Sequence, residues 1–330
     1  QREALDAVRR SAGEALARVK LVQFLFHRQW TALRSYCNGR GVRIIGDLPF
    51  YVAHDSADVW AHRDCFKLDS AGHVARMAGT PPDYFSRTGQ LWGNPVYDWT
   101  RMRKDGYSWW LDRMDRNYEL YDLVRIDHFR GIVASWQVPA GHKTAVRGRW
   151  VRGPGADLLE AMSLRRPRPP VLAEDLGTIT AEVRGLIDRY GLPGMKPLLF
   201  AFNKTMPRSP YIPHNIPPNS IVYTGTHDNN TARGWFESEA DATARRQLFA
   251  YLGREVPADQ VAPELVRLAM LSPARTAIIP MQDLLNLDGQ ARMNHPGAKG
   301  PNWLWRVTDE QLNADLAKHL ADLTKTYGRR

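Results

Sequence analysis

The chain has 330 residues, of which 43% are hydrophobic and 10% aromatic, so it can bury a core as one large barrel or two ordinary domains and is not expected to be disordered. Its formal charge is +10, but the arginines are scattered rather than gathered in one stripe, which argues against a nucleic-acid-binding protein. No apolar run approaches the ~18 to 20 residues of a membrane helix, and the first residues lack a signal peptide's apolar stretch, so we expect no membrane partner.

The first predicted element is a helix over residues 1–37, where apolar residues such as Leu5, Val8 and Ala12 recur at helical spacing. Gly39 and Gly41 end this helix. A short apolar strand at 42–48 follows and contains Asp47. Five further apolar strands are predicted at 123–127, 171–175, 195–200, 221–226 and 276–280. Helices are predicted at 107–120, 156–164, 180–190, 240–252, 259–271 and 309–327.

This alternation of buried strands and helices is typical of an α/β fold with a parallel sheet, and we expect a (β/α)8 barrel. The roughly seventy residues between the first two strands are far more than the usual connection of about 2 to 6 residues, so they predict an insertion. Its middle is rich in Gly, Pro, Asp and aromatic residues, which favours a structured binding loop that presents Trp92, Tyr84 and Phe85 as platforms. The expected domains are 1–49 (barrel helix and strand), 50–120 (insertion) and 121–330 (remaining barrel units).

Arg125 and Asp127 are two residues apart on a predicted strand, so their side chains leave the same face. A guanidinium beside a carboxylate lowers the carboxyl pKa and keeps the group ionised, as a nucleophilic carboxylate requires. An ordinary structural ion pair explains these two residues equally well.

Glu174 follows an apolar strand and precedes another acid, Asp175. Loss of hydration and a neighbouring negative charge both raise a carboxyl pKa, which suits a general acid. Strand alternation sends the two side chains in opposite directions, so only one faces the barrel lumen. The alternative is that this pair caps the next helix, a role that fits Asp175.

His227 and Asp228 directly follow a polar strand end, Tyr-Thr-Gly-Thr. A lone His-Asp pair at such a place is usually a turn or a cap. The functional alternative is a pair that binds sugar hydroxyls, since ionised acceptors form the stronger hydrogen bonds. Three acids at strand ends suggest sugar chemistry on a barrel.

Other chemistries find little support in the sequence. It contains no nucleophile elbow, Walker loop, dinucleotide fingerprint or zinc-binding His-Glu-x-x-His motif. The histidines form no convincing metal set, so we expect no metal and no cofactor. Cys37 and Cys65 are too few for a disulfide scaffold, which favours a reduced, cytoplasmic setting.

Seven stretches, taken together and in order, closely resemble the amylomaltases, which are 4-α-glucanotransferases of glycoside hydrolase family 77, also called disproportionating enzymes. The resemblance runs from about residue 20 to the C-terminus. The seven stretches are Gly46–Trp60, Pro81–Ser86, Gly89–Pro95, Val124–Gly131, Leu172–Gly177, Tyr190–Lys196 and Tyr223–Asn229.

The resemblance implies a cytoplasmic transferase of glycogen, starch and maltodextrin metabolism, with a retaining mechanism on α-1,4-glucans. Asp127 would be the nucleophile, Glu174 the general acid and base, and Asp228 the residue that grips hydroxyls of the distorted donor sugar. The partners would be an α-1,4-glucan donor and a glucose or maltodextrin acceptor. The residues implied to bind substrate are Asp47, Asp83, Tyr84, Phe85, Trp92, Arg125, His227, Asn294 and Pro296.

The family's fold is a barrel of the α-amylase superfamily type, and its members are longer than this chain. The resemblance therefore implies an incomplete barrel, with about six of eight βα units present, whose missing partner is an N-terminal segment of its own chain. Unpaired strand edges invite aggregation, so we expect the 330 residues alone to be poorly soluble and little active. Thr80, Arg87 and Asn230 depart from the common family pattern and put the acceptor preference in doubt.

Two other functions stay open. An α-1,4-glucan hydrolase would pass the same intermediate to water, and an inactive glucan-binding fragment would bind sugar without turnover. Retaining chemistry predicts carboxyl groups of Asp127 and Glu174 about 5 to 5.5 Å apart, whereas ~6.5 to 9.5 Å would indicate inversion.

Overall fold

The computed structural model describes residues 2–82, 86–298, 300 and 302–329. The chain divides into two compact units, Gln1–Leu172 and Ala173–Arg330. A six-stranded sheet has the order β1-β4-β7-β8-β9-β10. Its members are β1 (Ile45–Leu48), β4 (Leu123–Ile126), β7 (Val171–Ala173), β8 (Gly194–Pro197), β9 (Ser220–Tyr223) and β10 (Thr276–Ile278). The six predicted strands are therefore confirmed, and β7, β8 and β9 are buried at every position, as continuous apolar runs predict.

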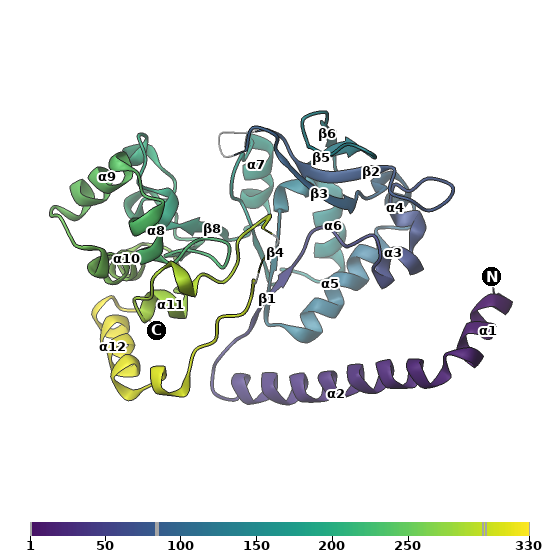
Figure 1. Ribbon diagram of the computed structural model, residues 1–330, viewed down its shortest axis with the longest axis horizontal. Coiled ribbons are helices and arrows are strands. Elements are labelled where there is room, and N and C mark those ends of the chain that lie inside the picture. Colours follow the sequence, from purple (N-terminus) through teal and green to yellow (C-terminus); the bar gives the residue numbers. More distant parts are fainter. Residues whose placement is uncertain (1, 83–85, 299, 301, 330) are drawn as a thin grey trace. The chain divides into compact units, whose positions relative to one another are not determined.

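In the first unit, the predicted N-terminal helix is two helices, α1 (Arg2–Ser11) and α2 (Gly13–Asn38). Gly39 caps α2, and Gly41 takes the left-handed conformation with φ 74°, which glycine adopts without strain. The long helix α2 runs beside α5 (Ser108–Leu120) (Figure 1). It contacts the end of α5, where Trp30 donates to the Leu120 carbonyl at 2.8 Å and Arg34 pairs with Asp122 at 2.7 Å.

The insertion contributes to a second sheet that the sequence did not predict. This antiparallel sheet has the order β3-β2-β5-β6, with β2 (Arg76–Thr80), β3 (Gln90–Pro95), β5 (Ala134–Pro139) and β6 (Arg149–Arg152). Strands β2 and β3 contain Ala, Gly, Asn and Pro, which are depleted in strands, so local pattern does not reveal them. The other helices of this unit are α3 (Ala57–Ala61), α4 (Trp99–Lys104) and α6 (Ala156–Arg165). Buried aromatic rings, among them Phe50, Tyr97 and Trp110, form its core.

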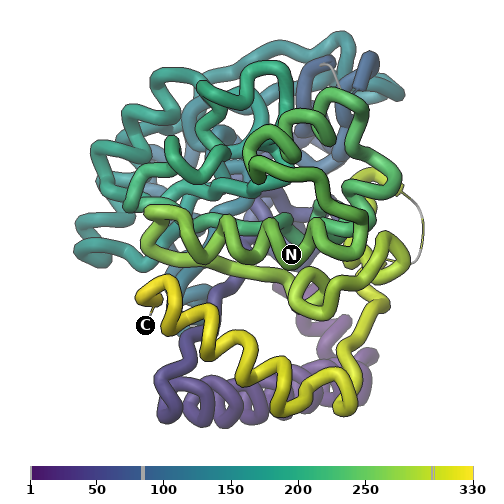
Figure 2. The backbone as a smooth tube through the Cα atoms, turned by 90° about the vertical axis from the view of Figure 1, so that its left-hand side faces the viewer, coloured from purple at the N-terminus to yellow at the C-terminus, as the bar shows by residue number. Residues whose placement is uncertain are grey.

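In the second unit, the helices predicted at 180–190, 240–252, 259–271 and 309–327 are confirmed as α7 (Ala181–Arg189), α9 (Ala242–Leu252), α10 (Ala258–Leu271) and α12 (Ala314–Thr326). Two short helices, α8 (Ala232–Ser238) and α11 (Met281–Leu284), were not predicted. The core packs α8 and α10 against β9, with Val222, Trp235 and Leu265 buried. The last helix, α12, lies against α10 (Figure 2). Just beyond α12, the guanidinium of Arg329 donates to carbonyls at the end of α10, where a cation is favourable.

Within the described part of the chain, no helix combines the length and the apolar character that a membrane span requires.

Candidate active site

In the first unit, one buried guanidinium holds two acids at the ends of neighbouring strands. Parallel pairing of β1 with β4 sets Asp47 opposite Arg125. Arg125 contacts the Asp47 carboxylate at 2.6 Å and the Asp127 carboxylate at 3.0 Å. The Arg125 side chain is 9% exposed, whereas the two acid side chains are 43% and 42% exposed. The cation is therefore fixed below two carboxylates that remain accessible to a ligand.

The residue after Asp127 is held in an unusual backbone conformation. His128 has φ 45°, a left-handed value that is uncommon for residues other than glycine and that is enriched at functional sites. Its imidazole packs edge-on against the Trp92 indole, with ring centroids 4.9 Å apart. Burial, and to a lesser degree the charge of Arg130, lowers the pKa of His128 to about 4, so this ring is neutral at pH 7.

Trp92 was predicted on an exposed loop, but it lies on strand β3. Its indole remains 38% exposed and packs beside Tyr51, with ring centroids 6.0 Å apart. A ring on a strand is placed more rigidly than one on a loop.

In the second unit, Glu174 and Asp175 do point to different partners, as strand alternation predicts. The Glu174 carboxylate accepts from the Leu176 amide at 2.8 Å. Asp175 accepts from the Lys196 ammonium at 2.6 Å and the Met195 amide at 2.7 Å, and burial raises its pKa against the opposing effect of the Lys196 charge. The helix-cap alternative is wrong, because the side chain of Thr180 caps α7.

Asp228 does not close the turn that contains it. The side chain of Asn229 does so, accepting from the Thr226 amide and hydroxyl, both at 2.9 Å. The Asp228 carboxylate instead accepts from the Asn294 amide at 2.6 Å and lies 3.4 Å from Nε2 of His227. His227 and Asp228 do lie in a turn, as the alternative predicts, but the Asp228 carboxylate also contacts residues outside it, and the structure brings His227, Asp228 and Asn294 together.

Arg292 is a residue of this site that the sequence analysis missed. Its guanidinium donates to the Asp228 carbonyl at 2.8 Å and to the Asn294 carbonyl at 2.9 Å, and pairs with Glu239 at 2.9 Å. Asn230 donates to the same Glu239 oxygen at 3.0 Å. Arg292 thus ties the two segments that carry Asp228 and Asn294, and its place two residues before Asn294 was the only signal in the sequence.

The remaining predicted residues are Pro296, Asp83, Tyr84 and Phe85. Pro296 is exposed in the segment that follows Asn294. Asp83, Tyr84 and Phe85 lie outside the described residues. Among the residues that the structure does describe, no group of three or more His, Cys, Asp or Glu side chains could hold a metal ion.

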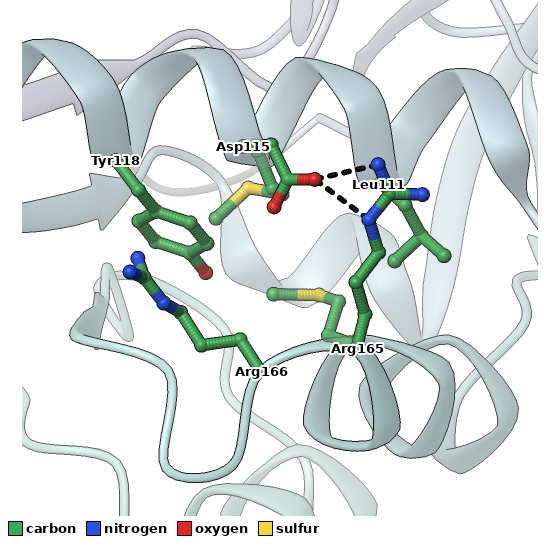
Figure 3. Close-up of a pocket in the computed structure, with 7 residues that line it drawn as sticks. Leu111, Asp115, Tyr118, Arg165 and Arg166 are labelled. Atoms are coloured by element: carbon green, nitrogen blue, oxygen red, sulfur yellow. Dashed lines mark hydrogen bonds and ion pairs between the residues drawn. The ribbon is translucent and has the colours of Figure 1, made fainter.

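A cavity of about 10 Å³ lies between α5 and α6 and is distinct from these residues (Figure 3). It is lined by Leu111, Met114, Asp115, Tyr118, Met162, Arg165 and Arg166. It has room for about one water molecule and contains none of the predicted site residues.

The chain is similar in sequence to proteins of one known family. Residues 1–312 match the family model described as 4-alpha-glucanotransferase. The chain is 46% identical over 328 residues to the 4-alpha-glucanotransferase of Streptococcus pneumoniae serotype 4, covering 99% of this chain and 64% of that protein. It is 47% identical over 308 residues to the 4-alpha-glucanotransferase of Aquifex aeolicus, covering 93% of this chain and 62% of that protein.

A solved structure is also similar. The chain superposes on the amylomaltase from Streptococcus agalactiae in complex with acarbose with a TM-score of 0.95 at 36% identity, covering 100% of this chain and 66% of that one. This similarity confirms the partial (β/α)8 barrel. The chain spans less than two thirds of the length of these three relatives.

Proposed function

Since this chain belongs to the 4-alpha-glucanotransferase family, glycoside hydrolase family 77, we propose that it transfers α-1,4-glucan segments between maltodextrins with retention of configuration. The observation that carries the proposal is the arrangement at Arg125, where a buried cation holds Asp127 and Asp47 as accessible carboxylates at strand ends. Catalytic residues of barrel enzymes come from this end of the strands.

In the first step, a carboxylate oxygen of Asp127 attacks C1 of the donor glucose. The bond from C1 to the glycosidic oxygen breaks, and the Glu174 carboxyl donates its proton to that oxygen, so the leaving glucan departs as an alcohol. A β-glucosyl ester on Asp127 remains. The buried guanidinium of Arg125 stabilises the ionised carboxylate before attack.

In the second step, the Glu174 carboxylate takes the proton of an acceptor 4-hydroxyl. The acceptor oxygen attacks C1, the ester bond breaks, and Asp127 is released as a carboxylate. Two inversions at C1 restore the α configuration. Water in place of the acceptor would give hydrolysis, which is the alternative function.

The other residues would bind the glucan. Asp228, with His227 beside it, would accept hydrogen bonds from hydroxyls of the donor sugar, and this contact would strengthen as the ring flattens toward the oxocarbenium-like transition state. Asn294 would share that role, since its amide already contacts Asp228. Asp47, Trp92 and Pro296, together with Asp83, Tyr84 and Phe85, remain proposed contacts of the same substrate.

The relative whose structure contains acarbose supports a glucan-binding site of this kind. A cytoplasmic setting is also part of the proposal, supported by two cysteines that form no disulfide.

Incubation with maltotriose tests the function. Transfer produces a ladder of both longer and shorter maltodextrins, hydrolysis produces only shorter sugars, and a glucan-binding fragment leaves maltotriose unchanged. The mechanism has its own test, because a crystal structure that places the Asp127 and Glu174 carboxyls ~6.5 Å or more apart would indicate inversion instead.

A further inference from the structure

Trp303 stands out among the residues that the proposed function does not use. Its backbone has φ 63°, in the left-handed region. For a bulky side chain this conformation is a genuine outlier that costs free energy, and such residues persist where the surrounding structure enforces them, often at ligand clamps. The side chain is nevertheless 51% exposed, so burial of the indole does not explain the strain.

Hydrogen bonds hold Trp303 in this position. Its amide donates to the Met293 carbonyl at 2.8 Å, and the His295 amide donates to the side chain of Asn302 at 3.0 Å. Arg306 donates to the Trp303 carbonyl at 3.2 Å. These hydrogen bonds connect the strained residue to the segment that carries Arg292 and Asn294.

The position places the indole beside the sugar-binding pair. The ring of Trp303 packs against the His227 imidazole, with centroids 5.3 Å apart and an angle of 37° between the planes. Nε2 of His227 lies 3.4 Å from the Asp228 carboxylate, which accepts from Asn294. An exposed aromatic surface therefore adjoins three polar side chains that suit hydroxyl groups.

We propose that Trp303 is a substrate-binding residue that stacks on a glucose ring of an α-1,4-glucan whose hydroxyls are held by Asp228 and its neighbours. A pyranose ring carries apolar C–H faces and polar hydroxyl edges, so it fits a site with an aromatic wall and a few fixed polar groups. The inference rests on the proposed function, because it assumes that the Asp228 site takes this sugar. The left-handed backbone is then a cost of presenting the indole to the ligand.

Two variants of the full-length protein, Trp303→Asn and Trp303→Phe, test whether the ring binds substrate or only packs within the fold. Asparagine tolerates the left-handed conformation but has no ring, whereas phenylalanine keeps a ring. For the Asn variant we expect a melting temperature equal to or above the wild-type value and a KM for maltotriose raised about tenfold with little change in kcat, the pattern of lost ground-state binding. The Phe variant should keep KM within about threefold of wild type.

Trp60→Ala is the matched control, since this tryptophan is 70% exposed on α3 and lies among no predicted site residues. It should leave KM unchanged. A wild-type KM in Trp303→Asn would overturn the inference while leaving the transferase proposal intact. If the wild-type protein makes no maltodextrin ladder, the transferase proposal fails by itself. Retardation in native gels containing soluble starch then decides on Trp303, because equal retardation of wild type and Trp303→Asn overturns its role and weaker retardation of the variant supports it.

Discussion

The two units fix their strand-end acids by different physical means. In the first unit, the Arg125 guanidinium contacts the carboxylates of Asp47 and Asp127 directly, at 2.6 and 3.0 Å. In the second unit, the Arg292 guanidinium reaches the backbone carbonyl of Asp228 and is charge-paired with Glu239. The carboxylate of Asp228 accepts instead from a neutral amide, that of Asn294. One acid is placed by charge, and the other by the geometry of a loop.

The difference matches the work proposed for each acid. A nucleophile must be ionised at the moment of attack, and a direct, buried cation favours that state. An acid that grips hydroxyls needs its oxygens at fixed positions, and a hydrogen-bonded loop supplies them. Substitutions at the acids, and then at their two arginines, therefore test whether the contrast is real.

The largest effect is expected at the acids themselves. Asp127→Asn replaces the carboxylate proposed to form the covalent bond by a neutral amide, so kcat should fall by about 10⁴-fold or more. Asp228→Asn keeps a carbonyl oxygen that can accept from Asn294, so the loop stays in place and kcat should fall by about 10²- to 10³-fold. Initial rates of glucose release from maltotriose measure both. Equal losses in the two variants would contradict the contrast between the acids.

The two arginines should differ in the same sense. Arg125→Gln leaves two carboxylates close together without their shared cation, and kcat should fall by about 10²- to 10³-fold. Arg292→Gln loosens a loop but removes no contact of the Asp228 carboxylate, because Arg292 contacts the backbone carbonyl. A fall in kcat of about tenfold is therefore expected, and Arg292→Lys should recover part of it.

Arg233→Gln is the matched control for Arg292, because Arg233 also pairs with a glutamate of the second unit, Glu237, at 2.8 Å on the surface of α8. It should have the activity of wild type. A larger loss in Arg292→Gln than in Arg125→Gln would show that loop geometry matters more than the direct cation.

The sequence predicted the parts of this contrast that are local. An acid after a buried apolar run predicts a strand end, which placed Asp127, Glu174 and Asp228, and helical spacing predicted α5, α7 and α10. Arg292 could not be predicted, because its partner Glu239 is 53 residues away and only the fold brings the two together. Trp303 was missed for another reason, since a left-handed φ at a tryptophan leaves no trace in sequence.

The antiparallel sheet was also not predicted, because it too depends on contacts between residues distant in the sequence. Its strands are stabilised by pairing between distant segments, such as Gly79 with Trp136, and the composition of β2 does not favour a strand. The closeness of Asp47 and Arg125 also follows from the register of β1 against β4, which no local pattern specifies.

A smaller effect concerns pH and belongs to the first unit. Burial lowers the pKa of His128 from 6.5 to about 4, so between these values the unfolded chain binds a proton that the folded chain does not. Stability from this residue is therefore complete above pH 6.5 and is lost as the pH falls toward 4, by about 3 kcal/mol in all. Urea unfolding from pH 7 to pH 4 measures it.

His128→Asn suits the left-handed backbone and carries no titrating ring, so its stability should fall less over this range than that of wild type. His319→Gln, at an exposed position on α12 of the second unit, should follow the wild-type curve. Parallel curves for wild type and His128→Asn would show that the imidazole is not the source of the pH dependence.

The smallest effect should come from an arginine that is anchored by charge but exposed. Arg165 bridges Asp112 and Asp115 at 2.8 and 2.6 Å. Figure 3 shows its pair with Asp115 beside the cavity between α5 and α6. Its geometry resembles that of Arg125, yet all three side chains are substantially exposed, so water and salt screen the pairs. Arg165→Gln should therefore lower the free energy of unfolding only slightly, and 0.5 M NaCl should remove most of the difference. Urea unfolding with and without salt measures this, with Arg116→Gln, from the exposed Arg116 and Glu119 pair on the same helix, as the control. A large loss of stability that persists in salt would mean that burial is not what separates Arg125 from other charge-anchored arginines of this unit.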